Sequence, residues 1–364
     1  MEHINLDNEE FQKALQIIQF TRRSLFLTGK AGTGKSTFLR YISETTKKKH
    51  VILAPTGIAA INAGGSTLHS FFKLPFHPLL PNDTRYNVRN MRKTLRYTSE
   101  KCKLLREVEL IIIDEISMVR ADIIDFIDKV LRVYNRNMRE PFGGKQLLLV
   151  GDIYQLEPVV REEDRQLLAP FYHSQFFFDA KVFASLQLVS IELTKVYRQN
   201  SPTFINLLDH IRSSHVTTAD LEMLNRQVGA DIDTSDSSLS ITLSTRRDTV
   251  DYINSTRLAE LDGDATIFDG TIEGDFPENN LPSPLKLELK VGAQVLFVRN
   301  DKEKRWVNGT LGTVTGFSLD VEDSKDAIIY VRTEDGVEFD VEQEIWSNIK
   351  YTFNEKEQKI EESV

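Results

Sequence analysis

The chain has 364 residues, 40% of them apolar and 27% charged, which indicates a globular protein of two to three domains. Its single cysteine, Cys102, excludes an internal disulfide and favours a reducing compartment. A formal charge of −9 argues against nucleic-acid binding by the surface as a whole, and no apolar run approaches the roughly 20 residues of a membrane span. The N-terminus also lacks the basic and apolar regions of a signal peptide, so we expect neither secretion nor membrane insertion.

The first half of the chain alternates aliphatic runs with helical patterns. Apolar residues at helical spacing predict a helix over residues 11–18 and another over 122–133. Continuous aliphatic runs predict buried strands at 24–28, 50–56, 109–115 and 145–152, and polar residues follow each of them. This alternation predicts a parallel sheet covered on both faces, whose ligands bind beyond the carboxyl ends of the strands.

Residues 74–106 interrupt this pattern and look like an insertion. They include a basic segment, residues 85–106, which contains eight basic residues and one acidic residue, Glu100. The basic side chains are Arg85, Arg89, Arg92, Lys93, Arg96, Lys101, Lys103 and Arg106. Two hypotheses remain open for this segment, a nucleic-acid contact or a solvated helix face.

The second half of the chain changes character. A strand at residues 238–245 and a helix at 247–261 would form another α/β unit. From residue 285 to about 351, short runs separated by Asn-Gly and Asp-Gly turns predict a small barrel or a system of hairpins.

Residues 29–36, GKAGTGKS, match the phosphate-binding loop G-x-x-x-x-G-K-[ST] between a predicted strand and a predicted helix. Glycines let backbone amides turn toward the β- and γ-phosphates, the helix N-terminus adds partial positive charge, and Lys35 adds a full one. Ser36 is the expected Mg²⁺ ligand.

Two other strand ends carry groups suited to phosphoryl chemistry. Asp114 would hold Mg²⁺ through its water shell, and Glu115 would orient or deprotonate the attacking water. Gln155, after LLLVGD, would donate its amide to the γ-phosphate and accept from the water. The structural alternatives are an Asp-Glu pair that caps the next helix and a glutamine that closes a turn before Pro158.

In this order and spacing, five segments resemble motifs I, Ia, II, III and IV of the petite integration frequency (PIF) helicases, the RecD-like superfamily 1B. They are GKAGTGKST, APTGIAAINAGGSTLHSFF (54–72), IIIDEISM, GDIYQLEPV and LTKVYRQ (193–199). The resemblance covers residues 5 to about 312. LKVGAQVLFVRND and WVNGTLGTV (306–314) also resemble the segment that leads into that family's SH3-like domain.

The resemblance implies roles for further residues. Arg198 would be the arginine finger that reaches the γ-phosphate, and Gln12 would recognise adenine, with Gln16 as the alternative. The expected nucleotide contacts are Gly29, Ala31, Gly32, Thr33, Gly34, Lys35, Ser36 and Thr37. The expected contacts to single-stranded DNA are Thr56, Gly57, Ser66, Thr67, His69 and Asn308. For His69 a buried core position is an equal alternative, and we expect Phe71 and Phe72 in the core rather than against bases.

The resemblance also implies an architecture. It predicts an α/β fold of two RecA-like P-loop motor domains, the second incomplete, with a small inserted subdomain and an SH3-like β-barrel insertion. The expected ranges are 1–71 with 104–192 for domain 1A, 72–103 for subdomain 1B, 193–284 for domain 2A and 285–364 for domain 2B. The family's motifs V and VI do not occur before residue 364, which suggests a truncated chain.

The implied function is that of a monomeric, ATP- and Mg²⁺-dependent 5′-to-3′ DNA helicase in replication, repair, recombination or telomere maintenance. Its partners would be single-stranded DNA and DNA junctions or G-quadruplexes. It would lie in the cytoplasm at the nucleoid if bacterial, or in the nucleus or mitochondrion if eukaryotic. The alternatives are a P-loop small-molecule kinase, which needs neither Gln155 nor Arg198, and a nucleotide-switched DNA-binding protein that does not unwind.

Overall fold

The computed structural model describes residues 8–75, 77–197, 201–229, 239–274, 276, 281–303, 305–306, 308–318, 327–347, 350–354 and 359–363. The chain divides into two compact units, residues 1–221 with 348–364 and residues 222–347. The first unit is an α/β unit, and the strands described in the second unit all pair antiparallel.

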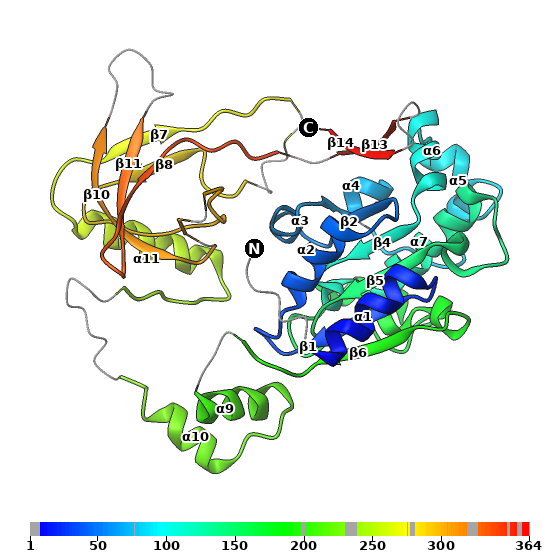
Figure 1. Cartoon of the computed structure of the whole chain (residues 1–364), viewed down its shortest axis with the longest axis horizontal. Coiled ribbons are helices and arrows are strands. Elements are labelled where there is room, and N and C mark those ends of the chain that lie inside the picture. The colour runs from blue at the N-terminus through cyan, green and yellow to red at the C-terminus, as the bar shows by residue number, and fades with distance from the viewer. Residues whose placement is uncertain are drawn as a thin grey trace. The chain divides into compact units, whose positions relative to one another are not determined.

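A six-stranded parallel sheet forms the centre of the first unit (Figure 1). Its strands are β1 (Leu25–Gly29), β2 (His50–Ala54), β3 (Ser66–Thr67), β4 (Leu110–Ile113), β5 (Gln146–Val150) and β6 (Val189–Leu193), in the order β3-β2-β4-β5-β1-β6. The four strands predicted from aliphatic runs are confirmed, and so is the predicted parallel sheet.

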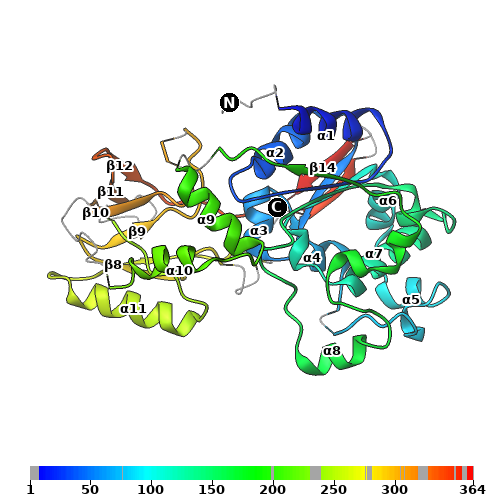
Figure 2. The same ribbon diagram turned by 90° about the horizontal axis from the view of Figure 1, so that it is seen from below.

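Helices cover both faces of this sheet, as the figures show from several sides (Figures 1 and 2). The helices up to the boundary between the two units are α1 (Glu9–Phe20), α2 (Lys35–Thr45), α3 (Gly57–Ala63), α4 (Leu68–Phe72), α5 (Met91–Leu95), α6 (Ser99–Glu107), α7 (Ala121–Asn135), α8 (Glu162–Leu168), α9 (Pro202–Arg212) and α10 (Thr218–Asn225), and the boundary lies within α10. Short 3-10 turns lie at Thr84–Tyr86, Ile116–Met118, Pro141–Gly144, Phe177–Asp179 and Lys181–Ala184.

The sheet separates two hydrophobic cores. In β4, Leu110 and Ile112 pack with residues of α1 and α2, whereas Ile111 and Ile113 pack with residues of α4, α6 and α7. Successive side chains of a strand point to opposite faces, so a strand between two cores must be aliphatic at every position. This explains why β4 and β5 have no polar residue except Gln146 at the first position of β5.

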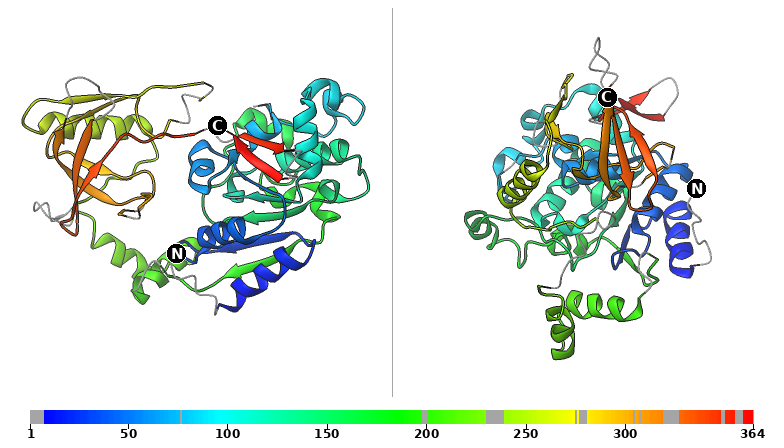
Figure 3. Two further views of the ribbon diagram at one scale, coloured as in Figure 1. Left: turned by 45° about the horizontal axis from the view of Figure 1, so that its top comes forward. Right: turned by 90° about the vertical axis from the view of Figure 1, so that its left-hand side faces the viewer.

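The predicted insertion packs on the second of these cores. Phe71 and Phe72 are buried there, which confirms their expected core position, and Met91, Leu104 and Leu105 extend the same core. Asp122, at the start of α7, accepts a hydrogen bond from the backbone N of Leu79 at 2.9 Å. Near the end of the chain, β13 (Lys350–Asn354) and β14 (Lys359–Ser363) form a hairpin, and β13 lies beside α6 (Figure 3).

The second unit contains α11 (Arg247–Glu260), an antiparallel pair of β7 (Thr266–Asp269) with β8 (Lys286–Leu289), and a four-stranded antiparallel sheet. That sheet has the order β12-β11-β10-β9, from β9 (Gln294–Leu296), β10 (Leu311–Ser318), β11 (Ile328–Thr333) and β12 (Glu338–Val341). Its small core includes Leu289, Ala293, Val314 and Val331. The predicted β-rich character and the predicted helix at 247–261 are confirmed.

The strand predicted at 238–245 is wrong for the part that the structure describes, residues 239–245, which form no strand. Ile241 and Leu243 have exposed fractions of 51% and 86%, so these aliphatic residues do not enter the small core of their unit. An extended segment without strand partners is not stable as β-structure. Among the described helices, none combines the length and the apolar character that a membrane crossing requires.

Candidate nucleotide-binding site

The turn between β1 and α2 has the geometry of an anion cradle. Gly34 has a φ of 94° and precedes α2, whose first turn receives no side-chain cap. The backbone N–H groups of that turn therefore point outward, where phosphate oxygens can accept from them. A Cβ on Gly29 would lie 2.5 Å from the carbonyl O of Leu193, so only glycine fits at this position.

Lys35 lies folded over the same turn. Its Nζ donates to the carbonyl O of Gly29 at 2.6 Å and to that of Lys30 at 3.0 Å. Burial lowers the pKa of Lys35, while the charges of Asp152, Glu115 and Asp114 act to raise it. The predicted residues Lys35, Asp114 and Glu115 are therefore close enough to interact electrostatically, and Asp152 joins them.

Asp114 and Glu115 follow β4 as predicted. Asp114 is anchored by its backbone N, which donates to the carbonyl O of Leu53 at 2.9 Å. Burial, with a smaller contribution from Glu115, raises the pKa of Asp114 to about 6. Glu115 has a φ of 49°, an uncommon conformation for a residue other than glycine and one often found at functional sites.

This arrangement suits a magnesium–nucleotide complex. A buried carboxylate whose charge is disfavoured gains from a nearby cation, and Ser36 stands at the second position of α2. Mg²⁺ is bound by few protein oxygens and completes its shell with water and phosphate, so Asp114 and Ser36 are a sufficient protein contribution. The fit supports the predicted ligands, whose role remains a prediction.

Asp152 belongs to the site, although no role was predicted for it from the sequence. It is the second residue after β5, directly after Gly151, and its side chain is 1% exposed. Its carboxylate accepts from Arg212 at 3.0 Å and from the backbone N of Tyr154 at 3.1 Å. The signal was present in the sequence, since Asp152 ends an aliphatic run as Asp114 does.

Gln155 lies beside this carboxylate. Its side chain is exposed, its backbone N donates to the carbonyl O of Asp152 at 3.0 Å, and its Nε2 donates to Asp152 Oδ2 at 3.3 Å. One N–H of the amide is thus used by Asp152. The other N–H and the amide oxygen remain as potential partners of a phosphate and a water.

Helix α9 also reaches the site, which sequence analysis missed. Lys30 of the phosphate-binding loop pairs with Asp209 of α9, and the backbone N of Tyr197 donates to the carbonyl O of Gly32 at 2.8 Å. An arginine on an amphipathic helix carries no sequence signal of its own, so Arg212 emerges only from the tertiary structure. Arg198, the predicted arginine finger, lies outside the described residues.

The other predicted nucleotide contacts lie near the loop. Ala31, Gly32, Thr33, Gly34, Ser36 and Thr37 form the turn and the first residues of α2. Gln12 and Gln16 are both exposed on α1, which packs against α2 through the rings of Phe11 and Phe38 at 4.9 Å. Exposure therefore does not distinguish the two glutamines, and the adenine-recognising residue stays a prediction.

The predicted DNA contacts fall into two groups. Thr56 and Thr67 are N-caps, whose hydroxyl oxygens accept from the backbone N of Ala59 and of Ser70, and Gly57 and Ser66 lie next to them. His69 is half-buried, and burial together with the charge of Arg120 lowers its pKa. These five residues surround the carboxyl ends of β2 and β3, whereas Asn308 belongs to the second unit.

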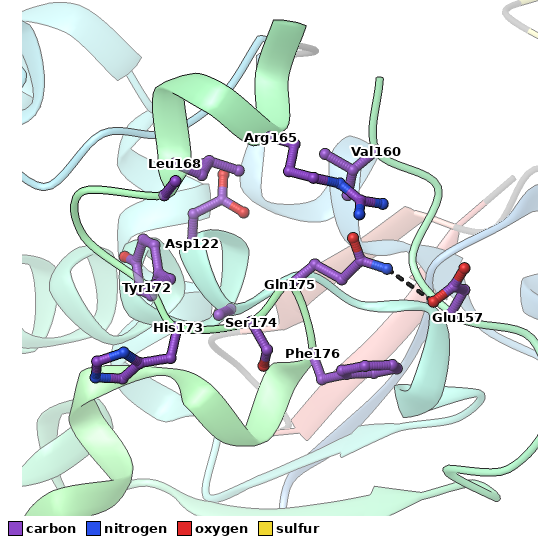
Figure 4. Close-up of a pocket in the computed structure, with 12 residues that line it drawn as sticks. Asp122, Glu157, Val160, Arg165, Leu168, Tyr172, His173, Ser174, Gln175 and Phe176 are labelled. Carbon is purple, nitrogen blue, oxygen red and sulfur yellow. Dashed lines mark hydrogen bonds between the residues drawn. The ribbon is translucent and has the colours of Figure 1, made fainter. Parts of the chain in front are cut away.

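A separate cavity of about 360 Å³ lies in the first unit (Figure 4). Its lining includes Asp122, Arg165 and Tyr172, and Gln175 donates across it to Glu157 at 2.9 Å. None of the predicted nucleotide-site residues lines this cavity. The chemistry of the phosphate-binding loop therefore belongs elsewhere in the unit, at the open end of β1.

A parallel sheet with a phosphate-binding loop after β1 and carboxylates after β4 and β5 defines a P-loop nucleotide-binding protein. The comparisons with known proteins narrow this class. Residues 5–222 match the model of the PIF1-like helicase family, and residues 277–317 match the model of the DNA helicase Pif1 2B domain. The chain belongs to the PIF1-like helicase family.

Individual relatives agree. A Bacteroides sp Pif1 structure in complex with ADP-AlF4 is 40% identical, with a TM-score of 0.85 over 98% of this chain and 78% of that one. A Bacteroides Pif1 structure bound to ssDNA is 40% identical, with a TM-score of 0.64 over the same shares. The ATP-dependent DNA helicase PIF1 of Rattus norvegicus is 36% identical over 85% of this chain. The chain spans 46% of that relative's length and 35% of the length of Candida albicans PIF1.

Proposed function

We propose that this chain is the ATP-hydrolysing part of a DNA helicase. It would bind ATP with Mg²⁺, move 5′-to-3′ along single-stranded DNA and unwind duplex or structured DNA in genome maintenance. The single observation that supports this proposal most is the convergence of Lys35, Asp114, Glu115 and Asp152 on one phosphate-binding turn. Family membership supports the DNA substrate, and the direction of movement is an expectation from the resemblance.

The side chains suggest a division of labour for hydrolysis. When bound, Mg²⁺ would neutralise phosphate charge, held by Asp114 and Ser36. Lys35 would exchange its bonds to the carbonyl oxygens of Gly29 and Lys30 for phosphate oxygens, since both are acceptors of the same ammonium. Glu115 would accept a proton from the attacking water, which Gln155 would help to orient.

The proposed DNA path uses groups that do not read sequence. Thr56, Gly57, Ser66, Thr67 and His69 offer hydroxyl, amide and imidazole groups at the carboxyl edge of the sheet, and Asn308 would add a contact from the second unit. The Bacteroides Pif1 structure bound to ssDNA supports single-stranded DNA as the ligand. The proposal also includes binding to DNA junctions and G-quadruplexes, a monomeric state, and the expected division into domains 1A, 1B, 2A and 2B. The proposed location is the nucleoid, the nucleus or the mitochondrion.

The proposal is tested by Glu115→Gln, which removes the proposed base and keeps the size of the side chain. We expect ATP hydrolysis in the presence of single-stranded DNA to fall by about 100-fold or more, because the water loses its proton acceptor. ATP binding, followed with a fluorescent analogue, should change less than about threefold, since Glu115 is assigned no role in binding the phosphates.

The control is Glu162→Gln, the same exchange at an exposed position on α8, which should leave ATP hydrolysis and ATP binding unchanged. Unaltered hydrolysis in Glu115→Gln would remove Glu115 from the mechanism. A wild-type chain that hydrolyses ATP without any response to single-stranded DNA, and transfers phosphate to a small molecule instead, would favour a kinase.

A further inference from the structure

Helix α9 makes two ion pairs with the nucleotide site from one of its faces. Asp209 and Arg212 are three residues apart, so their side chains project from the same side of the helix. Asp209 pairs with Lys30 in the phosphate-binding loop, and Arg212 pairs with Asp152 after β5. One helix therefore contacts both the loop that would hold phosphate and the strand end that carries Gln155.

The pair between Arg212 and Asp152 is bidentate and largely buried. Arg212 Nε lies 3.2 Å from Oδ1 and 3.0 Å from Oδ2, and Nη2 lies 3.0 Å from Oδ1. The side chains of Arg212 and Asp152 are 18% and 1% exposed. A carboxylate removed from water to this degree depends on its cationic partner to stay charged and in place.

The same carboxylate holds Gln155. Gln155 Nε2 donates to Oδ2, the oxygen that also accepts from Arg212 Nε, and the backbone N of Tyr154 donates to Oδ1. Asp152 thus fixes the turn that carries Gln155 and one N–H of its amide. The orientation of that amide depends on the orientation of the carboxylate, which Arg212 sets.

We propose that Arg212 is a positioning residue for ATP hydrolysis, which holds Asp152 so that Asp152 in turn aims the amide of Gln155. This inference rests on the proposed function, in which Gln155 faces the attacking water and the γ-phosphate. The proposal gives α9 a role in ATP hydrolysis, although Arg212 itself contacts neither the attacking water nor the γ-phosphate. It also explains why residue 152 is acidic, because a carboxylate can accept from Arg212 and from Gln155 at the same time.

The proposal requires an arginine rather than any cation. The planar guanidinium matches the two oxygens of Asp152, and it stacks on the ring of Tyr154 with Cζ 4.4 Å from the centroid. A lysine would keep the charge that Asp152 needs but would hold only one oxygen at a time. Arg212→Lys therefore separates orientation from charge compensation, and it is milder for folding than Arg212→Ala.

The experiment is a double-mutant cycle on the complete chain. We expect Arg212→Lys to lower kcat for DNA-stimulated ATP hydrolysis by about tenfold, with KM for ATP within about twofold, because orientation and not binding is lost. In a Gln155→Ala background, Arg212→Lys should lower kcat no further. Arg132→Lys is the matched control, since Arg132 has the same exposed fraction of 18% and pairs with Asp128 on α7, and it should leave kcat unchanged.

The outcomes separate the inference from the proposed function. The positioning role is overturned if Arg212→Lys lowers kcat equally in the wild-type and Gln155→Ala backgrounds. It is also overturned if the wild type is active and Arg212→Lys does not lower kcat. An equal loss in Arg132→Lys would show that any weakened Arg–Asp pair has this effect and would also overturn it. A wild-type chain that hydrolyses no ATP instead contradicts the proposed function.

Discussion

Lys101 combines a buried ammonium group with an aromatic neighbour. Its Nζ lies 3.2 Å from the ring centroid of Phe71, a contact that favours the charged form by about 0.5–2 kcal/mol. Burial, with a smaller contribution from the charge of Lys73, nevertheless lowers the pKa of Lys101 to about 7. We expect the cost of desolvation to be larger than the attraction of the ring.

This shift makes the stability of the protein depend on pH. The folded pKa lies below the unfolded value of 10.5, so the folded chain binds fewer protons than the unfolded chain between about pH 7 and 10.5, and stability rises with pH across that window. Lys101→Met should raise the free energy of unfolding at pH 7 by about 1–2 kcal/mol, a figure discounted for partial solvent access.

Urea unfolding at pH 7 and pH 10 measures the effect, and the advantage of Lys101→Met should shrink at the higher pH. Lys93→Met, at an exposed position of the same basic segment, should show no such difference. A variant that is less stable than wild type at pH 7 would mean that the contact with Phe71 outweighs burial.

At the scale of elements, a buried carboxylate at the start of α7, which is ion-paired within that helix end, also bonds to the inserted segment. Asp122 has a fully buried side chain that accepts from Arg120 at 2.6 and 2.8 Å and from the backbone N of Leu79 at 2.9 Å. No other acidic residue of α7 makes this connection among the described contacts. Asp122 therefore fixes where the insertion returns to the helix.

Asp122→Ala should cost about 3–5 kcal/mol, because it leaves Arg120 buried without a partner and the N–H of Leu79 without an acceptor. We expect a lower urea midpoint and faster proteolytic cleavage between residues 77 and 98. Arg85→Ala, which breaks an exposed pair with Asp83, should leave the midpoint unchanged. Cleavage that stays at the wild-type rate in Asp122→Ala would show that the apolar core alone holds the insertion.

Elements with a continuous aliphatic pattern could be predicted from the sequence, and elements that depend on neighbours could not. β4 and β5 are aliphatic because each lies between two cores, so their patterns are unambiguous. β6, at the sheet edge, alternates partly buried with exposed residues over its first four positions and was not predicted, and β3 has only two residues. Residues 239–245 show the reverse error, since aliphatic residues there lack strand partners.

The same distinction applies to the site. Lys35, Asp114, Glu115 and Gln155 are local features of strand ends, and the structure brings all four to one edge of the sheet. Arg212 joins them only because α9 returns to that edge about 60 residues after β5, a distance along the chain that no local pattern reveals.

For the whole molecule, the net charge is negative, but the basic segment is locally positive. Exposed basic side chains of the segment are Arg85, Arg89, Arg92, Lys93, Arg96 and Arg106, whereas Lys101 lies over Phe71. Arg85 pairs with Asp83, Arg92 donates to the carbonyl O of Val133, and Arg106 donates to the carbonyl O of Cys102. The remaining three, Arg89, Lys93 and Arg96, lie in or beside α5, and the hypothesis of a solvated face and that of a DNA contact can be tested on them.

We expect these three side chains to contact the duplex part of a forked DNA substrate. Replacing Arg89, Lys93 and Arg96 by Ala should reduce the slope of log affinity against log salt by about 2–3 for a fork, because each lost phosphate contact releases one counterion less. Fluorescence anisotropy at several salt concentrations measures this slope, and single-stranded DNA should show a change below about 1. The matched control is Ala at Arg22, Arg23 and Lys47, three exposed cations that precede β1 and β2 and lie outside the basic segment. Since the control removes the same net charge, an equal loss in both triple variants would attribute the effect to total charge and not to the basic segment.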